Sequence, residues 1–302
     1  MLKFFFGFVL ALAAAAAPAL AQGANQDRLF AESRFVVRDR FSDEIVGEGP
    51  DLIFIGGIAS RAAWKATAER LKGRYRLHLI QIAGFAGEPA RANAGGEVLI
   101  PMAEALDAYL VEQKLTPAVL IGHWLGGSVT LYLAERHPQH LTKALIVDAV
   151  PFIGNMQNPP LATVETIRPQ AERARDRILA AGQPTPEQIE PEMGAMSRDK
   201  ATRRLVAEWR ARSDHTVVAR VYYESLTWDL RLGLGSVETP ILVLHPDMAP
   251  LGVPPGQMEK AFPALYASAP GVRTKLVSDS LHFIMLDQPQ LFADTLDAFL
   301  AD

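Results

Sequence analysis

Gly122-His123-Trp124-Leu125-Gly126-Gly127 is the segment that most strongly indicates how this chain folds. It joins an apolar run at 118–121, which predicts a buried strand, to a segment at 125–136 whose pattern predicts a helix. A strand that turns at once into a helix leaves no room for a Cβ two residues before or after the central residue. Gly122 and Gly126 meet this demand around Trp124. The central residue of such a turn is held in a strained backbone conformation that exposes its side chain.

Strands and helices alternate on both sides of this turn. Each predicted strand is a short apolar run, and each predicted helix has apolar residues at helical spacing. The strands are predicted at 34–38, 52–55, 77–82, 118–121, 144–147, 241–244 and 274–277, and the helices at 62–72, 99–110, 125–136 and 289–300. This order predicts an α/β fold with a doubly wound, mostly parallel sheet.

The alternation is interrupted between about residues 151 and 239. This segment contains no convincing strand, and its periodicity predicts helices at 163–181, 198–212 and 216–230, separated by proline-rich turns. A helical insert in a parallel α/β domain is typical of a cap over the carboxyl ends of the strands, where such folds place their sites. We therefore expect one domain over 22–302 that includes this cap.

The first residues are typical of a secretory signal peptide. Lys3 supplies a positive charge, residues 4–17 are apolar, and Ala19-Leu20-Ala21 matches a small-x-small cleavage site. The apolar run is shorter than the ~20 residues needed to span a bilayer. We expect cleavage after Ala21, no stable membrane anchor afterwards, and a periplasmic or secreted protein.

Composition excludes several classes of function. The chain has 302 residues, a formal net charge of −4 and no cysteine. The absence of cysteine excludes disulfides and thiolate chemistry. No basic run of the kind that binds nucleic acid is present. The spacings typical of zinc enzymes and of phosphate-binding loops are also missing, so the sequence indicates neither a metal nor another cofactor.

The 122–127 turn resembles the nucleophile elbow of the α/β-hydrolase family. The resemblance extends from Arg34 to the C-terminus. Segments 83–87 and 148–152 are similar to those of exported bacterial esterase- or lipase-like members. It implies a carboxylic-ester hydrolase that acts on a small or medium apolar ester-like substrate. Members place Ser, Asp or Cys where this chain has Trp124. An indole has an N–H donor and no nucleophilic atom. We therefore expect activity through a Ser-His-Asp mechanism to be absent or severely impaired.

The resemblance also implies roles for other residues. His282 lies in the loop where the family keeps its general base. Its carboxylate partner is expected at Asp247, after the 241–244 strand, or alternatively at Asp148, after the 144–147 strand. The backbone N–H groups of Leu125 and Ile58 are the expected oxyanion hole.

Two alternatives remain open from the sequence. The chain can be a ligand-binding pseudoenzyme in which the indole forms an apolar wall for a small-molecule ligand. It can also catalyse without a side-chain nucleophile, with His282 and its carboxylate acting as a general base on water or on a substrate C–H.

Overall fold

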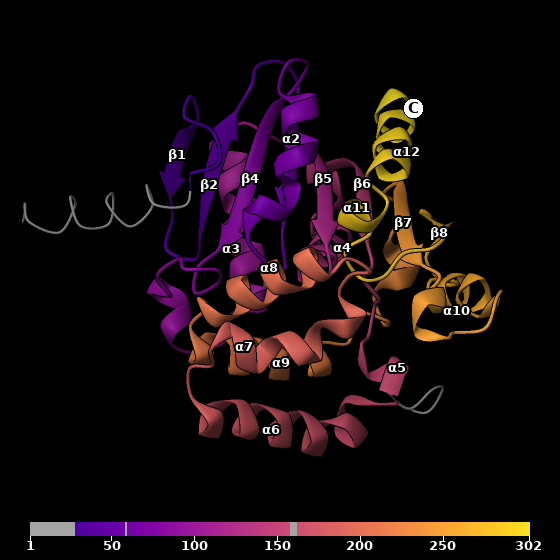
Figure 1. Ribbon diagram of the computed structural model, residues 1–302. Helices are drawn as coiled ribbons and strands as arrows, with labels where there is room; N and C mark the ends of the chain where they lie inside the picture. Colours follow the sequence, from indigo (N-terminus) through magenta and orange to yellow (C-terminus); the bar gives the residue numbers. More distant parts are fainter. Residues whose placement is uncertain (1–27, 58, 158–161) are drawn as a thin grey trace, which may run out of the picture.

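An eight-stranded sheet forms the centre of the computed structural model, which describes residues 28–57, 59–157 and 162–302. The predicted signal peptide lies outside the described residues. The strands are β1 (Arg34–Val37), β2 (Phe41–Val46), β3 (Asp51–Ile55), β4 (Arg76–Ile82), β5 (Ala118–His123), β6 (Leu141–Val147), β7 (Ile241–Pro246) and β8 (Val272–Val277). Their order is β1-β2-β4-β3-β5-β6-β7-β8. β1 and β2 are antiparallel additions at one edge, and the other six strands are parallel (Figure 1). The predicted doubly wound α/β fold is confirmed.

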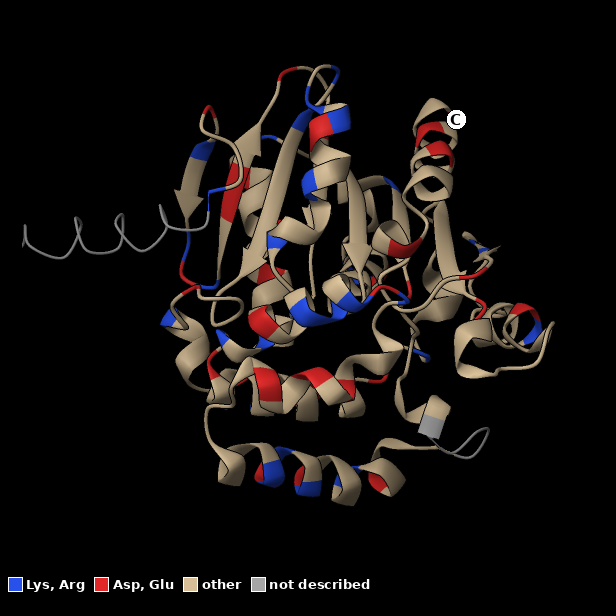
Figure 2. Cartoon of the chain, viewed as in Figure 1, with Lys and Arg blue, Asp and Glu red and all other residues tan. Residues whose placement is uncertain are grey.

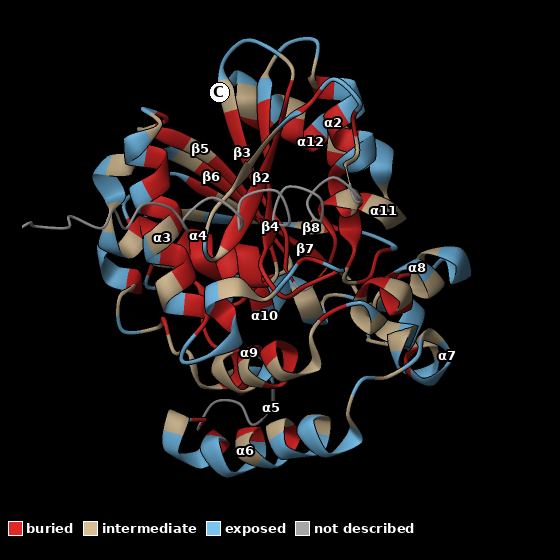
Figure 3. Ribbon diagram, turned by 90° about the vertical axis from the view of Figure 1, so that its left-hand side faces the viewer, coloured by how far each residue is buried: buried red, intermediate tan, exposed pale blue. Residues whose placement is uncertain are grey.

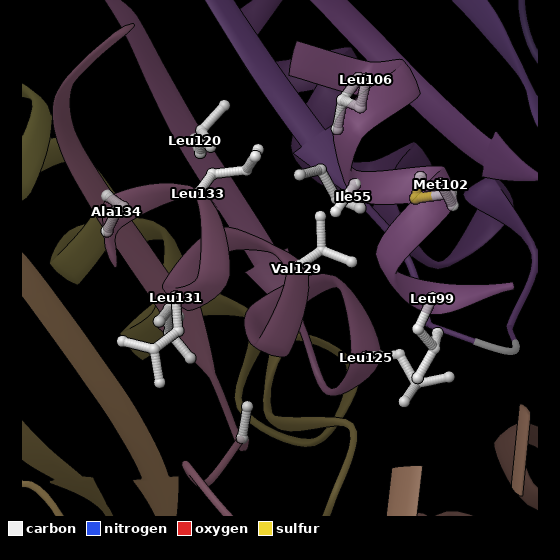
Figure 4. Packing of buried hydrophobic residues seen from close by; sticks show 14 of the residues in the cluster. Ile55, Leu99, Met102, Leu106, Leu120, Leu125, Val129, Leu131, Leu133 and Ala134 are labelled. Carbon is white, nitrogen blue, oxygen red and sulfur yellow. The ribbon is translucent and has the colours of Figure 1, made fainter. Parts of the chain in front are cut away.

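Helices cover both faces of the sheet because the central strands are apolar on both faces. Along β3, Ile53 and Ile55 pack in the core cluster that contains α3 (Leu99–Glu112) and α4 (Leu125–Arg136). The alternate residues of β3 pack on the other face, against α2 (Lys65–Leu71) and α12 (Pro289–Ala301). Figure 4 shows the first of these clusters, and Figure 3 shows that the central strands are largely buried.

The sequence analysis missed β2, and its composition explains why. All six residues of β2 are buried although three of them are polar: Ser42, Asp43 and Glu44. Each of the two acids accepts hydrogen bonds from other parts of the chain. Glu44 accepts hydrogen bonds from the backbone N–H groups of Leu29 and Phe30, and Asp43 accepts one from the Tyr109 hydroxyl, 2.8 Å away. A buried strand that carries three consecutive polar residues does not show the apolar pattern on which sequence prediction depends.

The described residues between β6 and β7 form helices and no strand. These helices are α5 (Gly154–Gln157), α6 (Val164–Ala181), α7 (Pro186–Ile189), α8 (Lys200–Ala211) and α9 (His215–Thr227), followed by the short η5 (Leu234–Ser236), with η4 (Glu190–Ala195) between α7 and α8. We call α5 to α9 the helical insert. The parallel strands point toward it, and α9 lies between α6 and the sheet (Figures 1 and 3). Both acidic and basic residues occur along its outermost helix, α6 (Figure 2).

Two further helices, α10 (Gln257–Leu265) and α11 (Ile284–Asp287), were not predicted from the sequence. They flank β8, with α11 leading into α12. Among the described residues, no helix combines the length and the apolar character needed to cross a membrane.

Candidate active site

The turn between β5 and α4 is as tight as its glycines indicate. Trp124 is its central residue, with φ 49° and ψ −110°. A Cβ on Gly122 would lie 2.3 Å from the carbonyl oxygen of Gly126, and a Cβ on Gly126 would lie 2.1 Å from the carbonyl oxygen of Ile55. Both distances are far inside van der Waals contact. The strained conformation of Trp124 is therefore enforced by β3, β5 and α4 together, and it places the side chain at the carboxyl ends of the strands.

His282 and Asp148 form a pair beside this turn. The Nδ1–H of His282 donates to Oδ2 of Asp148 over 2.6 Å. Asp148 directly follows β6, the neighbour of β5, and its backbone N–H donates to the carbonyl oxygen of Leu244 in β7. The two side chains are only 13% and 11% exposed, so little water competes for the bond. Such a bond fixes the tautomer and the orientation of the imidazole.

The expectation that Asp247 pairs with His282 is wrong. One carboxylate oxygen of Asp247 accepts a hydrogen bond from the backbone N–H of Ala249 at 3.0 Å, and the other accepts one from Asp279 at 2.7 Å. Asp247 therefore ties the loop after β7 to the loop after β8. The second choice from the sequence, Asp148, is the carboxylate that contacts the histidine.

The indole of Trp124 lies between His282 and the turn that follows β3. Its ring meets the imidazole edge to face, with centroids 5.7 Å apart and planes at 86°. A Cβ built on Gly57 would lie 3.0 Å from Cε3 of Trp124 and 3.5 Å from the backbone nitrogen of Leu125. The indole thus occupies space next to one of the two expected oxyanion-hole donors. The other expected donor, Ile58, lies outside the described residues.

His123, which the sequence analysis did not single out, supports the histidine loop. It ends β5, is buried, and donates through Nε2 to the carbonyl oxygen of His282 over 3.1 Å. Burial holds the pKa of His123 well below its usual value, and the nearby imidazole of His282 lowers it further. His123 is therefore neutral. Its position directly before the central residue of the elbow was the only sequence signal for this role.

The histidine loop is also bonded to the helical insert. The backbone N–H of Phe283 donates to the carbonyl oxygen of Met196 over 2.9 Å. Asp287 accepts hydrogen bonds from the Ser197 hydroxyl and from the backbone N–H of Leu281. A movement of the insert is therefore coupled to the loop that carries His282.

We expect acid to destabilise the fold partly through His123. A histidine whose pKa is lowered by folding binds its proton more readily in the unfolded chain, so a falling pH stabilises the unfolded state. The stabilisation is complete above the unfolded pKa of about 6.5 and is lost as the pH falls toward the folded value, by at most about 1.4 kcal/mol per pH unit. Urea denaturation at about pH 7 and about pH 5.5 measures this loss.

The matched variant is His123→Gln, which keeps an N–H donor for the His282 carbonyl. It should lose less stability between the two pH values than the unaltered chain, whereas His215→Asn, at a partly exposed histidine, should lose the same amount. Equal losses in all three proteins would contradict the assignment. His245, whose pKa is also lowered by burial, contributes a loss that is common to the three.

A cavity of about 500 Å³ lies between α3, α6 and α9. Its described lining combines aromatic and basic side chains, among them Tyr223, Trp228, Arg168 and Arg220, and does not include Trp124 or the His282–Asp148 pair. The cavity therefore lies between the helical insert and α3, which packs on one face of the sheet. It is separate from the elbow.

A parallel sheet with a strained strand-to-helix turn, flanked by a His–Asp pair on neighbouring loops, defines the α/β-hydrolase class. The chain belongs to the Alpha/beta hydrolase family, whose model matches residues 52–295.

Relatives and solved structures agree with this assignment. Pimeloyl-[acyl-carrier protein] methyl ester esterase of Aeromonas salmonicida is 33% identical over 123 residues, which are 40% of this chain and 46% of that protein. The same enzyme of Aeromonas hydrophila is 35% identical over 124 residues, with the same coverage. The chain thus spans about half the length of these relatives. A hydrolase from Pseudomonas aeruginosa has a TM-score of 0.72 at 18% identity, covering 90% of this chain and 99% of its own. A thermophilic esterase from Thermogutta terrifontis has a TM-score of 0.69 at 19% identity, covering 89% and 98%. At these identities the structures establish the fold alone.

Proposed function

We propose that this chain is a carboxylic-ester hydrolase scaffold in which Trp124 occupies the position of the nucleophile. One observation carries the proposal: the residue in the strained elbow conformation is a tryptophan, and its ring lies edge to face against a histidine that Asp148 orients. The base and its carboxylate are kept, and the group on which they would act is missing.

The chemistry of the site supports this reading. In a Ser-His-Asp site the imidazole takes the proton of the serine hydroxyl as the oxygen attacks the ester carbonyl. The bond to Asp148 places the proton of neutral His282 on Nδ1 and leaves the lone pair on Nε2, the atom that a general base uses. Trp124 offers neither a hydroxyl proton nor a nucleophilic oxygen. No acyl-enzyme can therefore form at the elbow.

The proposed ligand is a small or medium apolar ester-like molecule. Relatives that share part of the sequence are named for the hydrolysis of a methyl ester, and the edge of the indole adds an apolar wall beside His282. The proposal includes export of the chain to the periplasm or medium, for which the N-terminal sequence is the support.

The intact His282–Asp148 pair favours one second candidate, hydrolysis without a side-chain nucleophile. His282 would take a proton from water, the hydroxide formed would attack the carbonyl carbon, and the leaving alcohol would receive that proton. This route keeps the base and needs no residue at the elbow. The remaining possibility is that the site binds an ester and does not hydrolyse it.

We expect the unaltered chain to hydrolyse p-nitrophenyl acetate and butyrate no faster than its His282→Ala variant. The reason is that the base has no nucleophile to activate at position 124. Both rates are measured with highly purified protein, from the absorbance of the p-nitrophenolate that is released. Turnover that disappears with His282→Ala would replace the main proposal by the water-based route. Equal background rates, with saturable ester binding that Trp124→Ala abolishes, would identify a binding protein.

A further inference from the structure

Three metal-ligating side chains meet at the far end of α4 from the elbow. They are Asp107 of α3, His137 at the C-terminal end of α4 and His140 of the short helix η3 (Pro138–His140). One ligand atom from each lies within 4.8 Å of the other two. Nδ1 of His140 is 2.8 Å from Oδ1 of Asp107, and Nδ1 of His137 is 3.7 Å from Oδ2. The carboxylate lies between the two imidazoles.

The local backbone explains this convergence. His137 caps the end of α4, and Pro138 after it begins a 3₁₀ turn, in which side chains three residues apart lie on the same side. The rings of His137 and His140 are accordingly stacked, with centroids 5.7 Å apart and planes only 5° from parallel. Asp107 is buried and faces them from α3. Because Asp107 lies far from the two histidines in the sequence, the three residues form no local metal-binding motif.

A second carboxylate orients one of these histidines. Nε2 of His137 lies 3.1 Å from Glu104, which also accepts a hydrogen bond from the Tyr132 hydroxyl over 2.6 Å. A neutral imidazole has one N–H. When it points to Glu104, the lone pair of Nδ1 faces the Asp107 carboxylate, and two acceptors oppose each other. A cation between them removes this conflict. Metal-bound histidines commonly donate their other N–H to a carboxylate in this way.

We propose that Asp107, His137 and His140 bind one divalent transition-metal ion of the zinc type. Two imidazole nitrogens and a carboxylate oxygen suit Zn²⁺, and also Cu²⁺ or Ni²⁺, better than Mg²⁺ or Ca²⁺. Three protein ligands leave a fourth position for water. Bond lengths of about 2 Å require the side chains to close in on the ion by small rotations.

The ion would hold α3 to the connection between α4 and β6. The twelve residues of α4 separate this cluster from the elbow by about 18 Å, at 1.5 Å per residue. The site therefore serves stability, and its occupation should leave any activity at Trp124 or His282 unchanged. The metal-site proposal rests on contacts that the proposed function does not use.

Calorimetric titration of the untagged, chelator-treated chain with ZnCl₂ tests the proposal. We expect saturable binding of one ion per chain and a rise in Tm on adding zinc, because an ion that binds only the folded state stabilises it. Asp107→Asn, His137→Gln and His140→Gln should each weaken binding at least about tenfold, and Glu104→Gln should weaken it by about 10- to 100-fold. His215→Asn, outside the cluster, is the matched control and should bind as the unaltered chain does.

The Tm of each variant in EDTA shows whether it folds without the ion. If one variant is unfolded, the remaining two ligand variants decide. Absence of saturable zinc binding by the unaltered chain would overturn the proposal. So would binding that survives both histidine substitutions, because the ion would then lie elsewhere.

Discussion

Replacing Trp124 by serine is expected to raise the turnover of p-nitrophenyl butyrate by at least about a thousandfold over the unaltered chain. In a serine hydrolase, loss of the triad lowers kcat by about a millionfold, and the rest of the site supplies the residual rate. The substitution places a hydroxyl at the elbow, in the position from which the indole now contacts His282. It also removes the ring from the space near the Leu125 N–H, the expected oxyanion donor. Initial rates over a range of ester concentrations give kcat and kcat/KM.

Trp124→Ala is the control for this experiment. It removes the same ring without adding an oxygen, so it opens the pocket equally and supplies no nucleophile. Equal rates for the alanine and serine variants would show that access, and not covalent catalysis, limits the unaltered chain. His282→Ala in the serine background should return the rate to that of the alanine variant. A serine variant that stays inactive on acetate and butyrate esters would refute the ester-hydrolase proposal.

The elbow could be predicted from sequence because its cause is local. Two glycines four residues apart, between an apolar run and an amphipathic helix, describe a steric requirement that any chain making this turn must meet. The structure shows that requirement directly in the contacts a Cβ on Gly122 or Gly126 would make. The parallel strands were predictable for a similar reason, since burial on both faces leaves short apolar runs in the sequence.

The carboxylate partner of His282 could not be decided in the same way. Asp148 follows β6 and Asp247 follows β7, so both lie at the carboxyl edge of neighbouring strands. The choice depends on where the loop after β8 runs, and that path is fixed by distant contacts. Among these are the bond of His123 to the His282 carbonyl and the bond of Phe283 to the helical insert. None of these contacts leaves a pattern in the local sequence.

In the Trp124→Ser background, Asp148→Asn is expected to lower kcat by about ten thousandfold, while Asp247→Asn should leave kcat nearly unchanged. The asparagine at 148 can donate an N–H to Nδ1 of His282. The imidazole would then carry its proton on Nε2 and could not accept the serine proton there. The corresponding change in a serine protease triad lowers kcat by about 10⁴. Asp247 contacts backbone N–H groups, so its loss should instead lower the free energy of unfolding by about 1 kcal/mol.

Each variant therefore needs two measurements, kcat on p-nitrophenyl butyrate and the midpoint of urea denaturation. The two substitutions are the same in chemistry and differ only in what the carboxylate contacts, so each is the control for the other. A large loss of kcat in Asp247→Asn with a stable fold would mean that the histidine loop rearranges during the reaction and takes Asp247 as its partner. A loss of kcat confined to Asp148→Asn would establish that the pair seen beside the indole is the one that the chemistry uses.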